Sequence, residues 1–410
     1  MHRMKAGERM FNIFQALLGS VIMENFSTKR GSYNLHHFAT LLTEMCSSSC
    51  TAAMASHNLE RRKVPSGRWF RNMAHAISPD QLQMLARIML DETVRICQNS
   101  HLQKSRDLLI AIDKHMIPKF DRGDITGLVR AKEKAGSTLF ECYATMQIVS
   151  GQIPAILECI RVTPCLSNAD LLLKLTASLS AYGIRERLLL LDREFFAVDL
   201  MGVLSGAGRR FLMPARKHAG IKRAIDEFIA GRRAAISEYT MKNAAGLTFT
   251  FTLVITKKAD RRRKGRYRSK EEEECTKSRG PSGKKKKEKS IYDDYIAFAT
   301  NLPVEGIMGK IGRLIEDYRG RWRIEIGYRQ AESVRPWTTS KEPGYHFLLF
   351  IATLFMHNMW AFERITRDIS KDEMVLKALI RHAVEHAAGQ IAYYVDPGGG
   401  RKNPGPPAHF

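Results

Sequence analysis

Apolar residues recur at helical spacing through the first quarter of the chain. They predict helices over residues 35–45, 67–77 and 79–98, with Ser78 as the N-cap of the third. The same periodicity predicts later helices over 169–182, after a Ser167-Asn168 cap, and over 195–204, 221–229, 345–362 and 371–388. The N-terminal region is therefore expected to be helical.

Short apolar runs between these helices indicate buried strands. The runs at 108–113 (LLIAID) and 188–192 (LLLLD) each end in an aspartate, Asp113 and Asp192. Residues 138–149, 153–162 and 210–213 predict three more strands. Residues 247–256 (LTFTFTLVIT) alternate strictly, and 291–300 (IYDDYIAFAT) is predicted to be the return strand. The order of elements predicts an α/β fold with a mixed sheet.

The segment 311–337 carries an acid where an apolar residue is expected. Its apolar stripe at 311, 314, 315, 318 and 322 continues one turn later to Glu325, beside Arg321. A carboxylate on a core-facing stripe needs a cation, because an unpaired buried charge costs several kcal/mol. That cation is either Arg321 or Arg329, in a structural ion pair, or a bound metal ion.

Asp113, Asp192 and Glu325 together offer three hard oxygen ligands. Two aspartates at strand ends and one glutamate on a helix can converge on one or two divalent cations, and oxygen ligands suit Mg²⁺ or Mn²⁺. We therefore predict these three acids to be catalytic and metal-binding residues. The alternative for each aspartate is a cap on the turn that follows a strand.

Two motifs resemble the DDE transposases of bacterial and archaeal insertion sequences. They are DREFF at 192–196 and YRGRWRIEIGYRQ at 318–330. The resemblance is to the cut-and-paste (IS-four-like) superfamily, whose third acid lies in Tyr-x2-Arg-x3-Glu-x6-Lys. Tyr318, Arg321 and Glu325 match the first three positions, whereas Glu332 stands where the family has Lys. Arg329 or Arg335 is a candidate for the DNA-phosphate role of that lysine.

The resemblance implies a fold, a reaction and partners. It implies an RNase H-like sheet flanked by helices, with a β-rich insertion and a helical N-terminal region that binds transposon ends. It also implies a Mg²⁺-dependent enzyme, with Mn²⁺ as a substitute, that cuts terminal inverted repeats and joins them to target DNA. The implied assembly is a homodimer on DNA, with Tyr318 and Arg321 contacting DNA near the cut and excision passing through a hairpin.

Charge also favours a nucleic-acid partner. The chain has 65 Lys and Arg against 42 acids, a net charge of +23. Residues 257–289 carry 16 Lys and Arg against 6 acids and are expected to be a disordered loop that binds phosphates, Lys284 and Lys285 among them. Residues 59–72 (LERRKVPSGRWFRN) form a second basic stretch, either a DNA arm or an ordinary solvated loop.

These features predict five regions. They are a helical DNA-end-binding region (1–100), the first part of the catalytic core (101–230), a β-rich insertion (231–302), the second part of the core (303–370), and a C-terminal helix with a disordered tail (371–410).

Cysteine and hydropathy patterns add two expectations. Seven irregularly spaced cysteines indicate reduced thiols and a cytoplasmic, nucleoid-associated protein. No membrane helix is expected, since the longest apolar run, 347–356, is short enough for a buried helix. Two rival functions remain open: a metal-dependent nuclease without strand transfer, and a catalytically inactive transposon-derived DNA-binding protein.

Overall fold

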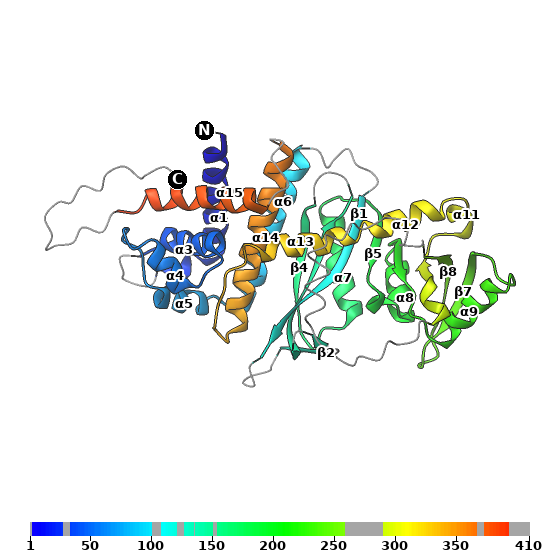
Figure 1. Cartoon of the computed structure of the whole chain (residues 1–410). Helices are drawn as coiled ribbons and strands as arrows, with labels where there is room; N and C mark the ends of the chain where they lie inside the picture. Colours follow the sequence, from blue (N-terminus) through cyan, green and yellow to red (C-terminus); the bar gives the residue numbers. More distant parts are fainter. Residues whose placement is uncertain are drawn as a thin grey trace, which may run out of the picture. The chain divides into compact units, whose positions relative to one another are not determined.

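The chain divides into two compact units (Figure 1). Unit 1 comprises Met1–Glu186 and Arg321–Phe410, and unit 2 comprises Arg187–Gly320. The computed structural model describes residues 2–27, 33–100, 108–120, 127–134, 136–150, 154–258, 290–366 and 373–392. The basic segment 259–289, with Lys284 and Lys285, and the tail beyond 392 lie outside this part. Each unit is considered by itself.

Unit 1 contains a helical layer built from both ends of its sequence. Its N-terminal helices are α1 (His2–Ile22), α2 (Glu24–Ser27), α3 (Leu35–Ser48), α4 (Ala52–Asn58), α5 (Gly67–His75) and α6 (Pro79–Ser100). The C-terminal helices α14 (Pro343–Thr366) and α15 (Glu373–Gly389) pack among them. Phe14 of α1 stacks on Phe355 of α14, with ring centroids 5.2 Å apart. Gly7 lets α1 approach α15 closely, because a Cβ there would lie 2.8 Å from the backbone nitrogen of Ala383.

Polar side chains cap the starts of these helices. Asn34 Oδ1 accepts from the backbone N–H of His36 at 3.0 Å, and Ser66 Oγ accepts from that of Trp69 at 3.2 Å. The predicted Ser78 cap is confirmed, since Ser78 Oγ accepts from Gln81 N–H and Gln81 Oε1 accepts from Ser78 N–H.

Unit 1 also holds an antiparallel group of strands. These are β1 (Leu108–Lys119), β2 (Val129–Lys134), β3 (Ser137–Ile148) and β4 (Ile156–Val162). Strand β3 pairs with all three others, and Asp113 of β1 lies opposite Thr145 of β3. Helices α6 and α7 (Asn168–Ala181) pack against β4, and α13 (Trp322–Glu332) packs against β1. Ser167 caps α7, as predicted.

Unit 2 carries a mixed group of strands. Strand β5 (Glu186–Leu191) runs parallel to β6 (Phe211–Pro214), which pairs antiparallel with β9 (Tyr295–Thr300). The sheet continues through β8 (Thr248–Lys257) to β7 (Ile236–Lys242). Its helices are the 3₁₀ turns η2 (Arg193–Phe195) and η4 (Ile291–Asp294), with α8 (Val198–Gly206), α9 (Ala219–Ile229), α11 (Val304–Ile307) and α12 (Ile311–Arg319).

The prediction of an α/β fold with a mixed sheet flanked by helices is confirmed, and most elements lie within a few residues of their predicted bounds. The strand predicted at 291–300 begins only at Tyr295. The preceding residues form η4, held by a bond from Asp293 N–H to Ser290 O of 2.8 Å. Strands β2 and β7 have no fully buried residue, so they lack the apolar pattern that would predict them.

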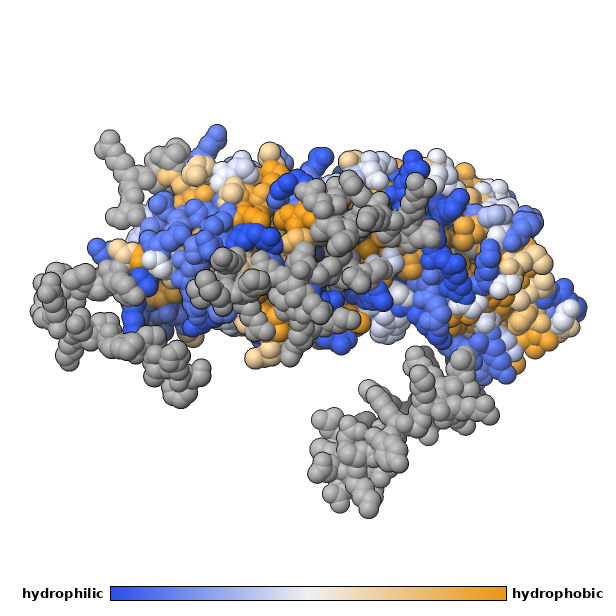
Figure 2. All heavy atoms as spheres, turned by 90° about the horizontal axis from the view of Figure 1, so that it is seen from above, coloured by the Kyte–Doolittle hydropathy of each residue, from blue (hydrophilic) through white to orange (hydrophobic). Residues whose placement is uncertain are grey.

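Helix α14 is the apolar helix predicted over 345–362. Among the described residues, one window, Pro343–Arg364, is long and apolar enough to cross a membrane by length and composition. However, 94% of that window is buried inside the protein, and core helices pass the same test. On the face shown in Figure 2, hydrophilic residues predominate, with smaller hydrophobic areas between them.

Two buried titratable groups of unit 1 should have opposite effects on stability as pH changes. Burial raises the pKa of Glu158 from 4.5 to about 7 and lowers the pKa of His357 from 6.5 to about 4. Glu158 therefore favours folding at low pH, and this contribution is lost as pH rises towards 7. The contribution of His357 is present above pH 6.5 and is lost as pH falls towards 4.

We expect the two slopes to offset each other between about pH 4.5 and 6.5. Glu158→Gln should lose up to about 3 kcal/mol of stability on acidification through this window, at 1.36 kcal/mol per unit. His357→Gln should instead become less stable as pH rises. Urea unfolding at several pH values measures both slopes, and parallel profiles for the two variants would contradict the assignment.

Candidate active site

Asp113 lies in the middle of a strand rather than at its end. The sequence predicted that the strand stops at Asp113, but β1 continues to Lys119 and stays paired with β3 throughout. The polar residues after Asp113 do not end the strand, because β3 supplies partners for their backbone groups. The Asp113 carboxylate is held in place by the backbone N–H of Lys114, which donates to Oδ1 at 2.9 Å.

Arg321 joins two of the three predicted acids. Its Nη1 lies 3.0 Å from Asp113 Oδ2, and its Nη2 lies 2.8 Å from Glu325 Oε1. The side chains of Arg321, Asp113 and Glu325 are 10%, 17% and 35% exposed. The predicted Arg321–Glu325 ion pair is therefore confirmed, and it includes Asp113. The guanidinium supplies the positive charge that this partly buried carboxylate pair requires.

The buried face of α13 fixes this arrangement. Ile324, Gly327, Tyr328 and Ala331 are buried, and a Cβ at Gly327 would lie 2.8 Å from the Gln147 side chain of β3. The Tyr328 hydroxyl donates to the backbone oxygen of Asp113 at 3.2 Å and bonds to Thr145 Oγ1. Burial, with the charge of Asp113, raises the pKa of Tyr328 well above its usual value, so the phenol stays protonated.

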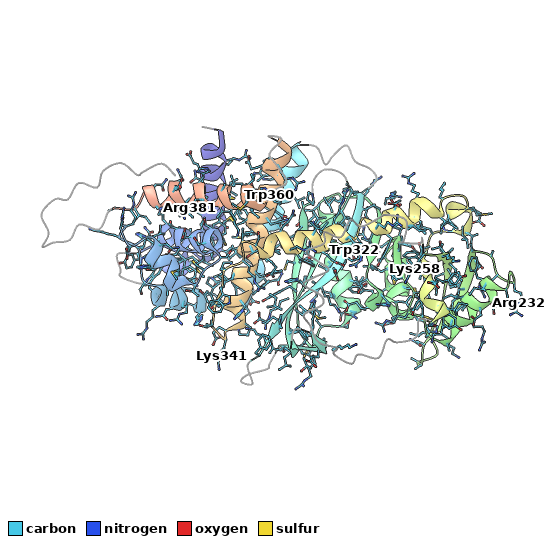
Figure 3. All side chains as sticks on the ribbon, in the orientation of Figure 1. Arg232, Lys258, Trp322, Lys341, Trp360 and Arg381 are labelled. Carbon is cyan, nitrogen blue, oxygen red and sulfur yellow. The ribbon has the colours of Figure 1, made fainter. Side chains whose placement is uncertain are left out.

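The apolar stripe predicted through Trp322 is wrong at that residue. Trp322 lies on α13 with 57% of its surface exposed (Figure 3). The helical segment is interrupted at Gly320 and Arg321, between α12 and α13. After this break Arg321 and Ile324, rather than Trp322, occupy the buried face.

Asp192 lies in unit 2, directly after β5, as predicted. It is the N-cap residue of η2, but its carboxylate caps nothing and has no hydrogen bond or ion pair among the described residues. Arg216 holds the turn that follows, since its Nε donates to Arg193 O at 3.1 Å and its Nη2 to Glu194 O at 3.0 Å. The side chain of Asp192 is thus available to a ligand.

Tyr318, the first residue of the predicted signature, also belongs to unit 2. Its hydroxyl donates to the backbone oxygen of Leu191 at 3.4 Å, one residue before Asp192. Its ring packs on Phe298 of β9, with centroids 5.0 Å apart. Tyr318 thus lies at the end of β5, where it helps to position the segment that carries Asp192.

The predicted DNA-binding arginines of unit 1 differ in availability. Arg329 is exposed, and its side chain has no ion pair within the described part of the chain. Arg335 Nη1 instead lies 2.9 Å from Glu332 Oε1. The same oxygen lies 2.8 Å from His115 Nε2. Glu332 thus belongs to a local charge cluster. Arg329 is the better placed of the two to contact phosphate.

The donor set suits a hard cation in type. Asp113 and Glu325 each place a carboxylate oxygen against the Arg321 guanidinium, and oxygen ligands are those that Mg²⁺ prefers. Within the described residues, however, no group of three or more His, Cys, Asp or Glu side chains is assembled for a metal ion. Participation of Asp192 alongside the other two acids stays a prediction.

The sequence did not reveal Tyr328, Thr145 or His115 as partners of this site. Tyr328 occupies an apolar position on the buried face of a helix, so its place in the sequence indicates an ordinary core residue. Its bond to the Asp113 backbone joins positions 215 residues apart, for which one sequence holds no signal.

Comparison with known proteins gives matches among solved structures. No protein-family model matches the chain. No curated protein matches it either. Among solved structures, it resembles the piggyBac transposase in a synaptic complex with hairpin DNA, with a TM-score of 0.54 and 10% sequence identity. The alignment covers 95% of this chain and 81% of that one. The chain has a transposase-like fold. At this identity the likeness concerns the fold alone.

Proposed function

We propose that this chain is a DNA transposase of the DDE type that cuts transposon ends and joins them to target DNA. The observation that carries the proposal is the contact of one arginine, Arg321, with both Asp113 and Glu325. Asp113 lies 208 residues from Arg321 along the chain, so this pairing is a product of the fold. The transposase-like fold supports the same reading.

Asp113, Asp192 and Glu325 would hold the Mg²⁺ ions, with Mn²⁺ as a substitute. When bound, such ions lower the pKa of water and neutralise charge on the transferring phosphoryl group. Asp192 is suited to this role because its carboxylate has no competing partner among the described residues. Asp113 and Glu325 are suited to it because Arg321 contacts a carboxylate oxygen of each.

The reaction is a series of in-line substitutions at phosphorus. In the first, a water oxygen attacks the phosphorus at the transposon end, the bond to the bridging 3′ oxygen breaks, and a 3′-hydroxyl is left. To form a hairpin, that hydroxyl attacks the opposite strand and displaces its 3′ oxygen, and a second water then opens the hairpin and frees the hydroxyl again. In the last step the hydroxyl attacks a target phosphodiester, so one P–O bond forms as another breaks. Arg321 would offset the charge of the phosphate, and Tyr318 and Arg329 would hold the strand beside it.

The solved relative adds two features to the proposal. Because that transposase was captured with hairpin DNA in a synaptic complex, we infer that excision here also passes through a hairpin and that two copies act together on paired ends. Arg335, Lys284 and Lys285 are further candidate DNA contacts. We place the protein in the IS-four-like superfamily of bacterial and archaeal elements, and hence in the cytoplasm at the nucleoid, on the motifs DREFF and YRGRWRIEIGYRQ.

A donor-cleavage assay tests the proposal. The DNA flanking the gene supplies the terminal inverted repeats, which are labelled and incubated with the purified chain, Mg²⁺ and a target plasmid. We expect hairpin-ended donor DNA and joined products on a denaturing gel. Cleavage without joined products would identify a nuclease, and binding without cleavage would identify an inactive transposon-derived protein.

A further inference from the structure

Unit 1 contains a cleft far along the chain from the predicted catalytic acids. It has a volume of about 1210 Å³ and is lined by the start of α3, by α4, by the loop between α4 and α5, and by residues after α15. Two bonds join the loop to the chain after α15: Lys63 N–H donates to Ala392 O at 2.9 Å, and Arg62 Nη1 donates to Ile391 O at 3.0 Å. Within the basic stretch 59–72, Arg62 and Lys63 are therefore held in place and form part of the wall of the cleft.

The lining of this cleft is strongly basic. Arg62, Lys63, Arg68 and Arg71 line it, against the single acid Glu60, which pairs with His57 at 3.0 Å. Lys63, Arg68 and Arg71 have no ion pair within the described residues. Cations that lie close together without acids repel one another. An anionic ligand bound among them reduces this electrostatic repulsion.

Helix starts and an aromatic ring add to this character. The N-caps of α3 and α5, Asn34 and Ser66, both line the cleft, so the positive ends of two helices are directed to it. Tyr33 lines it as well, and its ring lies 5.7 Å from Trp69 and 5.3 Å from His37. Cations combined with an anchored aromatic ring are typical of sites for unpaired nucleic-acid strands.

We propose that this cleft binds a short single-stranded segment of nucleic acid, with phosphates at Arg68 and Arg71 and a base on Tyr33. A duplex fits these features poorly, because its bases are stacked on one another and offer no free face to an aromatic side chain. The volume suits a few nucleotides, since pockets of about 300–1,000 Å³ hold one drug-sized ligand. This site is separate from strand cleavage and does not depend on it.

Fluorescence anisotropy on the full chain tests the phosphate contacts. The probes are a labelled oligothymidylate and a duplex of equal length, in Ca²⁺ so that cleavage does not intervene. Arg68→Ala/Arg71→Ala should weaken binding of the single strand about tenfold and make the slope of log K against log salt shallower by about 1.4, or 0.7 per phosphate. The control Arg130→Ala/Lys174→Ala removes two exposed cations of unit 1 outside the cleft and should change binding less than about threefold.

A second pair of variants tests the ring. Tyr33→Ala should weaken binding of the single strand on the order of 5- to 150-fold, the equivalent of about 1–3 kcal/mol per stacked base, whereas Tyr33→Phe should bind as the wild type does. Three results would each overturn the proposal. The first is an equal loss of affinity in the cleft double variant and the control double variant, and the second is a loss of affinity for the duplex as large as that for the single strand. The third is an equal loss of affinity in Tyr33→Ala and Tyr33→Phe. Thermal unfolding of each variant shows that it is folded, and donor cleavage by the wild type reports on transposase activity separately.

Discussion

Replacement of Asp192 by Asn, or of Glu325 by Gln, should reduce donor cleavage at least about 1000-fold while DNA binding in Ca²⁺ survives. Each change removes one negative oxygen ligand and keeps the size of the side chain. Loss of a metal ligand costs on the order of 4 kcal/mol of transition-state stabilisation, and 1.36 kcal/mol corresponds to a factor of ten in rate. Gel-based cleavage and filter binding on the same preparations measure the two properties.

Two acids of unit 2 provide matched controls for these variants. Asp199 lies exposed in the first turn of α8, and Glu316 is exposed on α12, where it pairs with Arg319. Asp199→Asn and Glu316→Gln make the same chemical changes away from the predicted cluster, so we expect cleavage close to that of the wild type. Cleavage retained by Asp192→Asn or Glu325→Gln would remove that residue from the site.

The sequence predicts Asp192 better than Asp113, and the reason is local. At Asp192 the apolar run and the strand end together, because η2 follows at once. At Asp113 the apolar run ends but the strand does not, since pairing with β3 continues for six more residues. Burial, which the pattern reports, ends at Ile112, whereas backbone pairing depends on a partner strand that the pattern does not show.

The Arg321–Glu325 ion pair was predicted correctly, although the buried face predicted for the same helix was partly wrong. The stripe through Tyr318 and Trp322 predicts a buried Trp322, but Trp322 is exposed and its neighbour Arg321 is buried. The Arg321–Glu325 pair survives because the two residues are four apart, within reach on any helical turn. The third member, Asp113, and the Tyr328 bond that holds it come from distant positions, which helical periodicity does not encode.

Replacement of Arg321 by Met should have the second largest effect, on both activity and stability. The change leaves Asp113 and Glu325 beside each other with no guanidinium between them. Removal of one partner of a buried pair costs about 3–5 kcal/mol. Because Glu325 is 35% exposed, we expect a smaller loss of about 1–3 kcal/mol in the free energy of unfolding. Cleavage should fall at least about 100-fold, by about 2.7 kcal/mol.

The response to Mg²⁺ separates a structural arginine from one that shares its carboxylates with a metal ion. If both acids can ligate a cation, Mg²⁺ should raise the thermal midpoint of Arg321→Met more than that of the wild type, since the ion then supplies the missing charge. Arg321→Lys should recover only part of the lost stability, because one ammonium group does not reproduce two bonds from separate guanidinium nitrogens. Arg313→Met, an exposed arginine of α12 without an ion pair among the described residues, is the control and should melt as the wild type does. An Arg321→Met variant that keeps the wild-type midpoint and cleavage rate would show that the Asp113–Arg321–Glu325 cluster contributes to neither.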